Sequence, residues 1–366
     1  MSGSHPHLRL QLALGLVFGA VLATGATAGA WGSEGRPPAL SVSADAAARH
    51  WVEHSGDRWA AYYSPQQYAV MTEALDGRYA GVGLWVVRSP SGVVTVSQVR
   101  GDGPAARASV RAGERLLAVD GRKVTGLPVT EVVALLRGGS PVAGTDVSLT
   151  LQQGKQLRTV TLRRQLLDAE DVVVDHPVTG ITRIVVSAFT TGTGDQVEAA
   201  VQQSAADRGR GILLDLRGNS GGLLEESVES ASSLLDGGPV GSYRDDGRTY
   251  PLTAEPGGNT GLPVVVLVDG GTMSAAELLT GALQDRGRAV VVGSRTFGKG
   301  AVQQPDPLPG GAVVERTVGH YRTPDGHDLD GTGITPDVPV PPADGAPAAE
   351  RTAMTVLNDL AGLDSQ

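Results

Sequence analysis

One serine of this chain stands in a setting that favours nucleophilic chemistry. Ser274 follows the apolar run PVVVLV at residues 263–268 and a turn at 269–271, and helical apolar spacing begins after it. At such a strand-to-helix junction a hydroxyl points away from the sheet, beside the free N–H groups of the first helical turn. This placement predicts a hydroxyl that can attack a carbonyl while those N–H groups hold the anion that forms.

A serine hydroxyl is a weak nucleophile without a base, and Lys299 is the candidate base. Lys299 lies between Gly298 and Gly300, where close backbone approach can hold the amine in a crowded pocket. Burial must then lower the amine pKa from about 10.4 to near neutrality. Gln303 is a neutral group that could hold the amine without raising its pKa, as a carboxylate would. The chemistry requires the Ser274 hydroxyl and the amine to come within hydrogen-bonding reach.

The elements around these residues predict an α/β core with a mainly parallel sheet. Short apolar runs, typical of buried strands, alternate with stretches of helical spacing. The expected strands are 181–187, 211–216, 263–268 and 288–293, and the expected helices are 195–206, 223–235 and one that starts near Ser274. The segment 237–262 is rich in glycine and polar residues and is expected to be a loop or a hairpin.

Four ordered motifs resemble those of the carboxyl-terminal processing peptidases, also called tail-specific proteases. They are DLRGNSGG at 215–222, MSAAELLTGALQD at 273–285, TFGKGAVQ at 296–303, and YRTPDG followed by GTGITPD between 321 and 337. The resemblance implies a serine endopeptidase with an acyl-enzyme intermediate, in which Ser274 is the nucleophile, Lys299 the general base and Gln303 the group that orients the lysine. Met273 departs from the family pattern, which usually has a small residue there.

The glycine turn at residues 218–222 follows an expected strand, so its N–H groups are expected to be free to meet an oxyanion. The family resemblance implies two oxyanion donors, the backbone N–H groups of Gly221 and Ala275, with an uncertainty of one residue at the glycine turn. Loss of one such donor typically costs about 3 kcal/mol of transition-state stabilisation.

Residues 81–165 form a second expected unit. Its motifs GPAARA at 103–108 and RAGERLLAVDGR at 111–122 resemble a PDZ domain. That resemblance implies that the C-terminal tail of a protein or peptide adds as a strand, with its terminal carboxylate bound by loop N–H groups. The peptide-binding loop would be formed by Gly81, Val82, Gly83 and Leu84.

Composition excludes several function classes. The 366 residues carry a formal net charge of −9 without a basic stripe, which argues against nucleic acid as a partner. There are no cysteines, so disulfides and thiolate metal sites are excluded. The chemistry proposed by the motifs needs no metal and no cofactor. The apolar stretch at 8–30 predicts that residues 1–31 are a signal peptide or a membrane anchor, and hence an exported, extracytoplasmic protein.

The remaining regions are expected to support these parts. Residues 32–80 are expected to be a linker and an N-terminal helical region, 166–340 the peptidase core, and 341–366 a proline-rich linker with a C-terminal helix. His50 and His54 share a helix face at metal-compatible spacing, but the sequence shows no third ligand, which favours a solvated surface. His320 and His327 are also expected on the surface or behind the site.

Two other functions fit parts of the sequence. GNSGG at residues 218–222 matches the G-x-S-x-G elbow of α/β-hydrolases, which would make Ser220 the nucleophile of an esterase, with Asp269 and His320 in the right chain order. Alternatively, the chain is a PDZ-containing scaffold whose peptidase-like domain has lost activity. The sequence specifies neither the oligomeric state nor the preferred tail.

Overall fold

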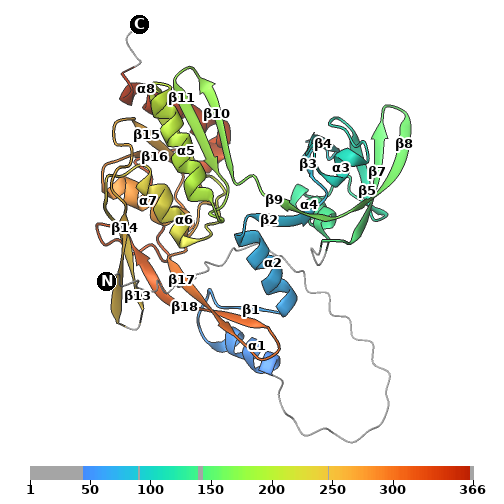
Figure 1. The fold of residues 1–366 in the computed structure, drawn as a ribbon, viewed down its shortest axis with the longest axis horizontal. Coiled ribbons are helices and arrows are strands. Elements are labelled where there is room, and N and C mark those ends of the chain that lie inside the picture. The colour runs from blue at the N-terminus through green and yellow to red at the C-terminus, as the bar shows by residue number, and fades with distance from the viewer. Residues whose placement is uncertain (1–43, 90, 139–142, 246, 363–366) are drawn as a thin grey trace, which may run out of the picture. The chain divides into compact units, whose positions relative to one another are not determined.

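The computed structural model describes residues 44–89, 91–138, 143–245 and 247–362 (Figure 1). The expected signal peptide or anchor at residues 1–31 lies outside these ranges. Among the helices within them, none has the length and apolar character needed to cross a membrane. The described chain forms two compact units. The core unit comprises the residues up to Pro65 and those from Asp171 onward, and the PDZ-like unit comprises residues 66–170.

A six-stranded sheet forms the centre of the core unit. Its spatial order is β10 (Val172–Val178), β11 (Ile181–Val186), β12 (Gly211–Asp215), β15 (Val264–Val268), β16 (Val290–Gly293) and β19 (Val338–Pro339). The strands from β11 to β19 run parallel to their neighbours, and β10 runs antiparallel to β11 at one edge. Parallel strands are usually covered on both faces, and every residue of β12 and of β15 is indeed buried.

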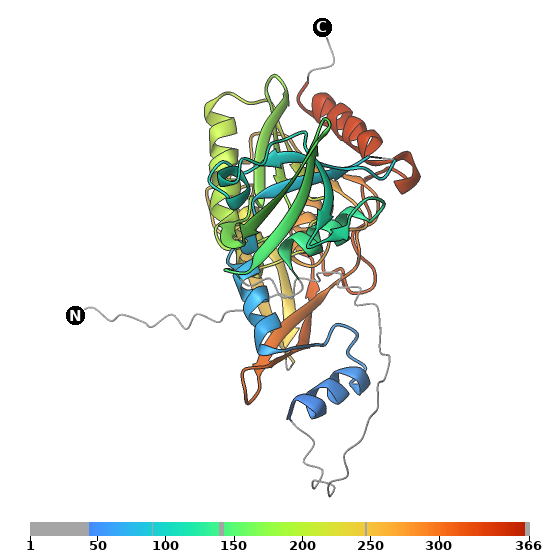
Figure 2. The same cartoon turned by 90° about the vertical axis from the view of Figure 1, so that its right-hand side faces the viewer.

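Helices cover both faces of this sheet (Figures 1 and 2). On one face lie α5 (Thr193–Ala206), α6 (Leu224–Ser232) and α7 (Ala275–Asp285). On the other face lies α8 (Ala346–Leu360), whose Ala353 and Leu357 pack against Leu213 and Val265 of the strands. The expected C-terminal helix is therefore an integral layer of the core unit. The short 3-10 turn η1 (Pro342–Asp344) leads into it.

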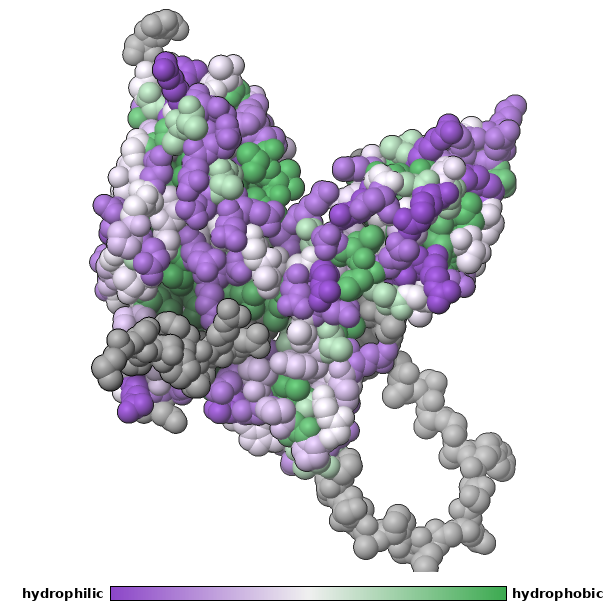
Figure 3. Space-filling view, in the orientation of Figure 1, coloured by the Kyte–Doolittle hydropathy of each residue, from purple (hydrophilic) through white to green (hydrophobic). Residues whose placement is uncertain are grey.

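The edge strand β10 exposes apolar side chains. Val173, Val174 and Val178 are exposed. In Figure 3 a hydrophobic patch lies over β10 on an otherwise largely polar face of the core unit. This strand follows the end of the PDZ-like unit in the chain and was not among the strands expected from the sequence.

A second sheet, entirely antiparallel, was missed by the sequence prediction of one mainly parallel sheet. Its strands are β1 (Ala61–Tyr63), β18 (Val313–Arg322), β13 (Gly238–Asp245) and β14 (Arg248–Ala254), with β17 (Ala301–Pro307) paired to β18. The hairpin of β13 and β14 corresponds to the segment expected to be a loop or hairpin. Stacking of Tyr243 on Tyr250, with ring centroids 5.0 Å apart, joins these two strands.

The N-terminal region is not continuously helical. Helix α1 (Ala44–His54) is followed by strand β1 and then by α2 (Pro65–Leu75). Strand β1 pairs with β18 so that Ala61 lies opposite Glu315. Pairing across such a sequence distance is invisible to a reading based on local periodicity. It brings the segment between α1 and β1 into the core unit.

Besides α2, with which it begins, the described part of the PDZ-like unit is a small β-structure with two further helices. Strand β2 (Arg78–Gly81) pairs with β9 (Gln165–Asp168). The main sheet has the order β3 (Leu84–Arg88), β4 (Val94–Val99), β5 (Arg115–Val119), β7 (Asp146–Gln153) and β8 (Gln156–Arg163), with β6 (Arg122–Lys123) on β5, and the helices are α3 (Pro104–Arg107) and α4 (Val129–Arg137). Val96, Leu116 and Leu149 lie at the centre of its apolar core. Strand β3 is an edge strand with no neighbour beyond β4 in the described part of the sheet.

Candidate active site

Ser274 occupies the junction between β15 and α7, as the sequence predicts. The turn before it is fixed by Thr272, whose hydroxyl donates to the Leu216 carbonyl at 2.8 Å and accepts from the Asp269 N–H at 3.0 Å. Ser274 has φ 55° and ψ −118°, in a region that side-chain-bearing residues rarely adopt. Such a conformation costs about 1–3 kcal/mol and is commonly found at functional sites.

The Ser274 hydroxyl is buried, and its Oγ has no hydrogen-bond partner among the described residues. An orphaned buried hydroxyl is unusual and calls for an explanation. The expected hydrogen bond between Oγ and the Lys299 amine is therefore not made in this conformation. The Lys299 Nζ lies 5.6 Å from the centroid of the Trp59 ring.

One buried carboxylate joins the backbones of the serine and the lysine. Glu277 Oε2 accepts from the Ser274 N–H at 2.9 Å and from the Lys299 N–H at 2.8 Å. Its Oε1 accepts from the Gly298 N–H at 2.7 Å and from the Thr296 hydroxyl at 2.5 Å. Burial raises the pKa of the Glu277 carboxyl, although these hydrogen bonds lower it. Glu277 belongs to the motif at 273–285, and its contacts connect both halves of the site.

Lys299 is enclosed, with only 1% of its surface exposed. Burial lowers the pKa of its amine from the ordinary value, because the charged form is poorly solvated there. The nearby Glu315 carboxylate opposes this shift. The lysine is therefore biased toward the neutral amine that a general base requires.

Glu315, on β18, is a charge near the lysine that the sequence did not indicate. It is almost fully buried, its Oε1 has no hydrogen-bond partner in the described chain, and its Oε2 accepts from the Tyr63 hydroxyl at 3.4 Å. Burial raises the pKa of Glu315 to about 7, against the opposing effects of the Lys299 charge and the Tyr63 hydrogen bond. The only possible signal was a glutamate in the apolar run AVVERTV, which gives no hint of its partner.

Gln303 lies on β17 and is buried. Its Nε2 donates to the Trp59 carbonyl. Trp59 is held in turn by its N–H on Asp57 Oδ1 at 3.0 Å and by its indole Nε1 on Asp330 Oδ1 at 2.9 Å. Gln303 thus fixes the residue whose ring lies beside the Lys299 amine. Its direct action on the amine stays a prediction.

The two expected oxyanion donors lie beside the serine. A Cβ on Gly221, whose φ is +96°, would lie 3.0 Å from the Ser274 Cβ and 3.4 Å from the Ala275 nitrogen. The Ala275 N–H has no acceptor among the described residues. The Gly221 N–H, expected to be free, instead donates to Asn219 Oδ1 at 2.8 Å. The asparagine side chain provides locally the acceptor that a substrate oxyanion would provide.

The alternative triad does not assemble. Asp269 Oδ1 accepts from the backbone N–H groups of Gly218 and Gly271, each at 2.9 Å. His320 is exposed, with its Nε2 3.6 Å from Asp330 Oδ2. No hydrogen bond joins Ser220, Asp269 and His320 in the ranges that the structure describes. His327 likewise stands at the surface, 3.5 Å from Asp285.

The expected peptide-binding loop lies between β2 and β3. Gly81 belongs to β2 and pairs with Gln165, so it is strand and not loop. The Val82 carbonyl accepts from Ala105 at 3.0 Å, and the Gly83 carbonyl accepts from Arg100 at 3.0 Å. These bonds fix the loop through its carbonyl groups. Leu84 opens the edge strand β3, and the binding role of the loop stays a prediction.

Known proteins resemble this chain in sequence and in fold. A solved structure titled photosystem II D1 C-terminal processing protease is 30% identical to this chain, covers 80% of it and 81% of its own length, and gives a TM-score of 0.53. The model of peptidase family S41 matches residues 180–340, and a PDZ domain model matches residues 95–153. The chain belongs to peptidase family S41.

Other S41 relatives agree with this assignment. A probable CtpA-like serine protease from Staphylococcus aureus (strain N315) is 31% identical over 294 residues, which are 79% of this chain and 58% of that protein. The chain thus spans little more than half the length of that relative. A putative S41 protease from Bacteroides fragilis shares the fold, with a TM-score of 0.58 at 17% identity over 91% of this chain and 94% of its own.

Proposed function

We propose that this S41 family member is a serine endopeptidase that cleaves proteins or peptides recognised through their C-terminal tails. One observation carries the proposal: the Glu277 carboxylate binds the backbone N–H groups of both Ser274 and Lys299. It thereby ties the backbone of a serine whose hydroxyl has no partner among the described residues to that of a lysine whose amine is desolvated. Family membership supports the same chemistry.

In the proposed mechanism, the neutral Lys299 amine takes the proton of the Ser274 hydroxyl as Oγ attacks the scissile carbonyl. The tetrahedral oxyanion is held by the N–H groups of Ala275 and Gly221. Collapse breaks the peptide bond, the leaving amine takes the proton from Lys299, and an acyl-enzyme remains. Lys299 then deprotonates a water molecule that hydrolyses the ester. These steps use no metal and no cofactor.

The described conformation needs two local changes before this chemistry. The Lys299 amine must come within hydrogen-bonding distance of Ser274 Oγ, and the Gly221 N–H must leave Asn219. Both are movements of side chains or of one turn, and catalytic hydrogen bonds are often formed only in the substrate complex. Substrate binding would supply the oxyanion that replaces the asparagine as acceptor.

Tail recognition is assigned to the PDZ-like unit. Its edge strand β3 offers unpaired backbone groups to an added strand, and the loop before it contains Val82 and Gly83. Export through the segment at residues 1–31 would place this activity outside the cytoplasm, where the protein would be secreted or anchored to the membrane.

The test uses a reporter protein with a free C-terminal tail and the same reporter with its tail amidated. Ser274→Ala and Lys299→Ala should each abolish cleavage, whereas Ser220→Ala should retain it. The free tail should be cut faster than the amidated one. Cleavage that survives Ser274→Ala would refute the mechanism, and equal rates on both tails would refute tail recognition alone.

A serine-directed covalent reagent separates an active enzyme from a scaffold. The wild-type chain should be labelled, and Ser274→Ala should not. An unlabelled wild-type chain that still binds the free tail would support the scaffold and overturn the peptidase proposal.

A further inference from the structure

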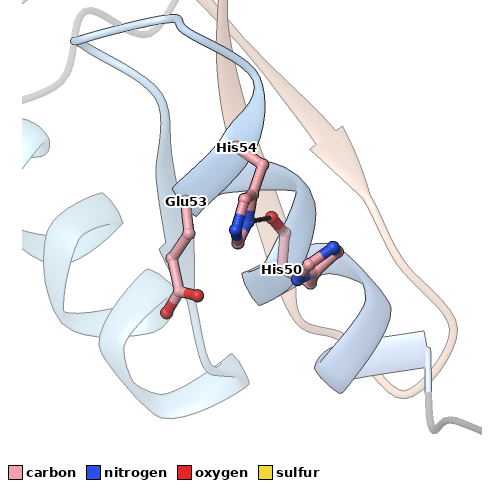
Figure 4. A group of neighbouring side chains, drawn as sticks. All are labelled: His50, Glu53 and His54. Atoms are coloured by element: carbon pink, nitrogen blue, oxygen red, sulfur yellow. Dashed lines mark hydrogen bonds between the residues drawn. The ribbon is translucent and has the colours of Figure 1, made fainter.

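Helix α1 carries three side chains of metal-ligating type close together (Figure 4). His50, Glu53 and His54 are exposed, and their candidate ligand atoms all lie within 4.8 Å of one another. Residues three and four apart on a helix share a face, which brings Glu53 and His54 to His50. Glu53 is the third side chain of ligand type, which the histidine spacing alone did not indicate.

The orientation of His54 suits a ligand. Its Nδ1 donates to the His50 carbonyl at 2.8 Å. A carbonyl oxygen can only accept, so in a neutral imidazole this bond places the proton on Nδ1 and the lone pair on Nε2. Histidines that bind metals ordinarily donate their other ring nitrogen to such an acceptor. The imidazole centroids of His50 and His54 are 4.0 Å apart, so the two rings lie side by side.

We propose that His50, Glu53 and His54 bind one divalent transition-metal ion of the zinc type. Two imidazole nitrogens and one carboxylate oxygen suit Zn²⁺, Co²⁺, Ni²⁺ or Cu²⁺ better than Mg²⁺ or Ca²⁺. Ligand atoms of a tetrahedral zinc site lie about 3.3 Å apart, because each stands about 2.0–2.1 Å from the metal. Rotation of these exposed side chains closes the remaining gap, and water completes the coordination.

Such an ion would stabilise a weakly held helix. Helix α1 has 11 residues and none of them is buried, and isolated helices this short are marginal in water. Arg49, which stacks over the Tyr62 ring at 4.0 Å, is one contact that holds it to the core unit. A metal that ties two turns of α1 together binds only the helical form and so stabilises it. The segment leading to Trp59 begins directly after His54.

The test is a titration of the full chain with Zn²⁺ followed by calorimetry, and with Co²⁺ followed by its visible absorption. All proteins carry His5→Ala and His7→Ala, which remove the other closely spaced histidines. One saturable site is expected. His50→Ala or His54→Ala should weaken binding by at least ~10-fold, the scale seen when a metal site loses a supporting group, and Glu53→Gln should weaken it less. His327→Ala, a surface histidine beside a carboxylate, is the control and should bind normally.

Two outcomes would overturn the site: absence of saturable binding, or binding unchanged by His50→Ala and His54→Ala together. Zn²⁺ should also slow amide hydrogen exchange within residues 44–54 of the parent protein and not of His54→Ala. Circular dichroism of each variant without metal checks that the fold is intact. Because the readouts are binding and exchange, failure here leaves the proposed peptidase activity untouched.

Discussion

The two halves of the candidate site differ in whether backbone or side chains form them. The serine half is backbone: the turn before α7, with its strained φ at Ser274, and the glycine turn at 218–222. The lysine half is made of side chains from separate segments, including Trp59 before β1 and Glu315 on β18. Local turns specify the first half, whereas tertiary pairing specifies the second. Substitutions should therefore act on the serine half through geometry and on the lysine half through solvation.

The largest effect should come from removing the proposed base, Lys299, while keeping its volume. Lys299→Met should lower kcat by up to ~10⁴-fold, the upper range for general acid–base catalysis. The pKa of Lys299 is lower in the folded protein than in the unfolded chain. At pH values just below the ordinary lysine pKa, the unfolded chain therefore binds more protons, and the free energy of unfolding rises with pH. Chemical denaturation across pH should show that rise in wild type and not in the variant.

Lys155→Met, at an exposed turn, is the matched control and should change neither activity nor that pH dependence. A Lys299→Met protein with more than a tenth of wild-type kcat would mean that the lysine half is only structural.

Geometry of the serine half is tested by Gly221→Ala. The new Cβ would lie 3.0 Å from the Ser274 Cβ, at a φ of +96° that alanine adopts poorly. Displacement of this donor should reduce kcat by about 10²–10³-fold, with KM changed less. Gly192→Ala has a similar φ of +85° and nothing within 4 Å, so it isolates the backbone penalty. Equal losses in both variants would contradict a role in the site.

Glu277→Gln tests the hydrogen bonds that connect the serine half to the lysine half. The amide keeps one acceptor oxygen and turns an NH₂ toward N–H or hydroxyl donors, so two of the four hydrogen bonds are lost. We expect a loss of roughly 3 kcal/mol in unfolding free energy and a further fall in kcat of about 10²-fold, as small displacements of reacting groups commonly cause. Glu225→Gln, exposed in the first turn of α6, is the control. Normal kcat in a destabilised Glu277→Gln protein would show that the two halves are positioned independently.

The smallest change is expected from Glu315→Gln. In wild type the Glu315 charge raises the pKa of Lys299, so its removal should move the acidic limb of the kcat/KM profile to lower pH. The folded pKa of Glu315, about 7, exceeds the ordinary value of 4.5. Its stabilising effect is therefore complete below pH 4.5 and is lost as pH rises through 7, a decline the glutamine variant should lack. An acidic limb that stays in place would mean that Glu315 does not tune the lysine.

The sequence predicted the serine half of the site better than the lysine half. Ser274, the strands around it and the glycine turn were all found, because apolar runs and turn residues are local signals. The antiparallel sheet was missed, since β1 is short and β17 contains Pro305 and Pro307, which oppose a strand assignment.

The lysine half depended on that missed sheet. Pairing of β1 with β18 is what brings Trp59 and Tyr63 toward Lys299 and Glu315. Nothing within either segment indicates the other. For the same reason the state of the Ser274 hydroxyl, which lacks the expected partner, was beyond a reading of motifs.

The place of α8 bears on when the central sheet of the core unit is closed. Buried residues of β11, β12 and β15 remain uncovered on one side until the last helix of the described chain has been synthesised and docked. A chain in which α8 has not docked therefore leaves one face of the sheet beneath the serine turn uncovered. The order of the elements alone delays closure of this sheet until α8 has been made.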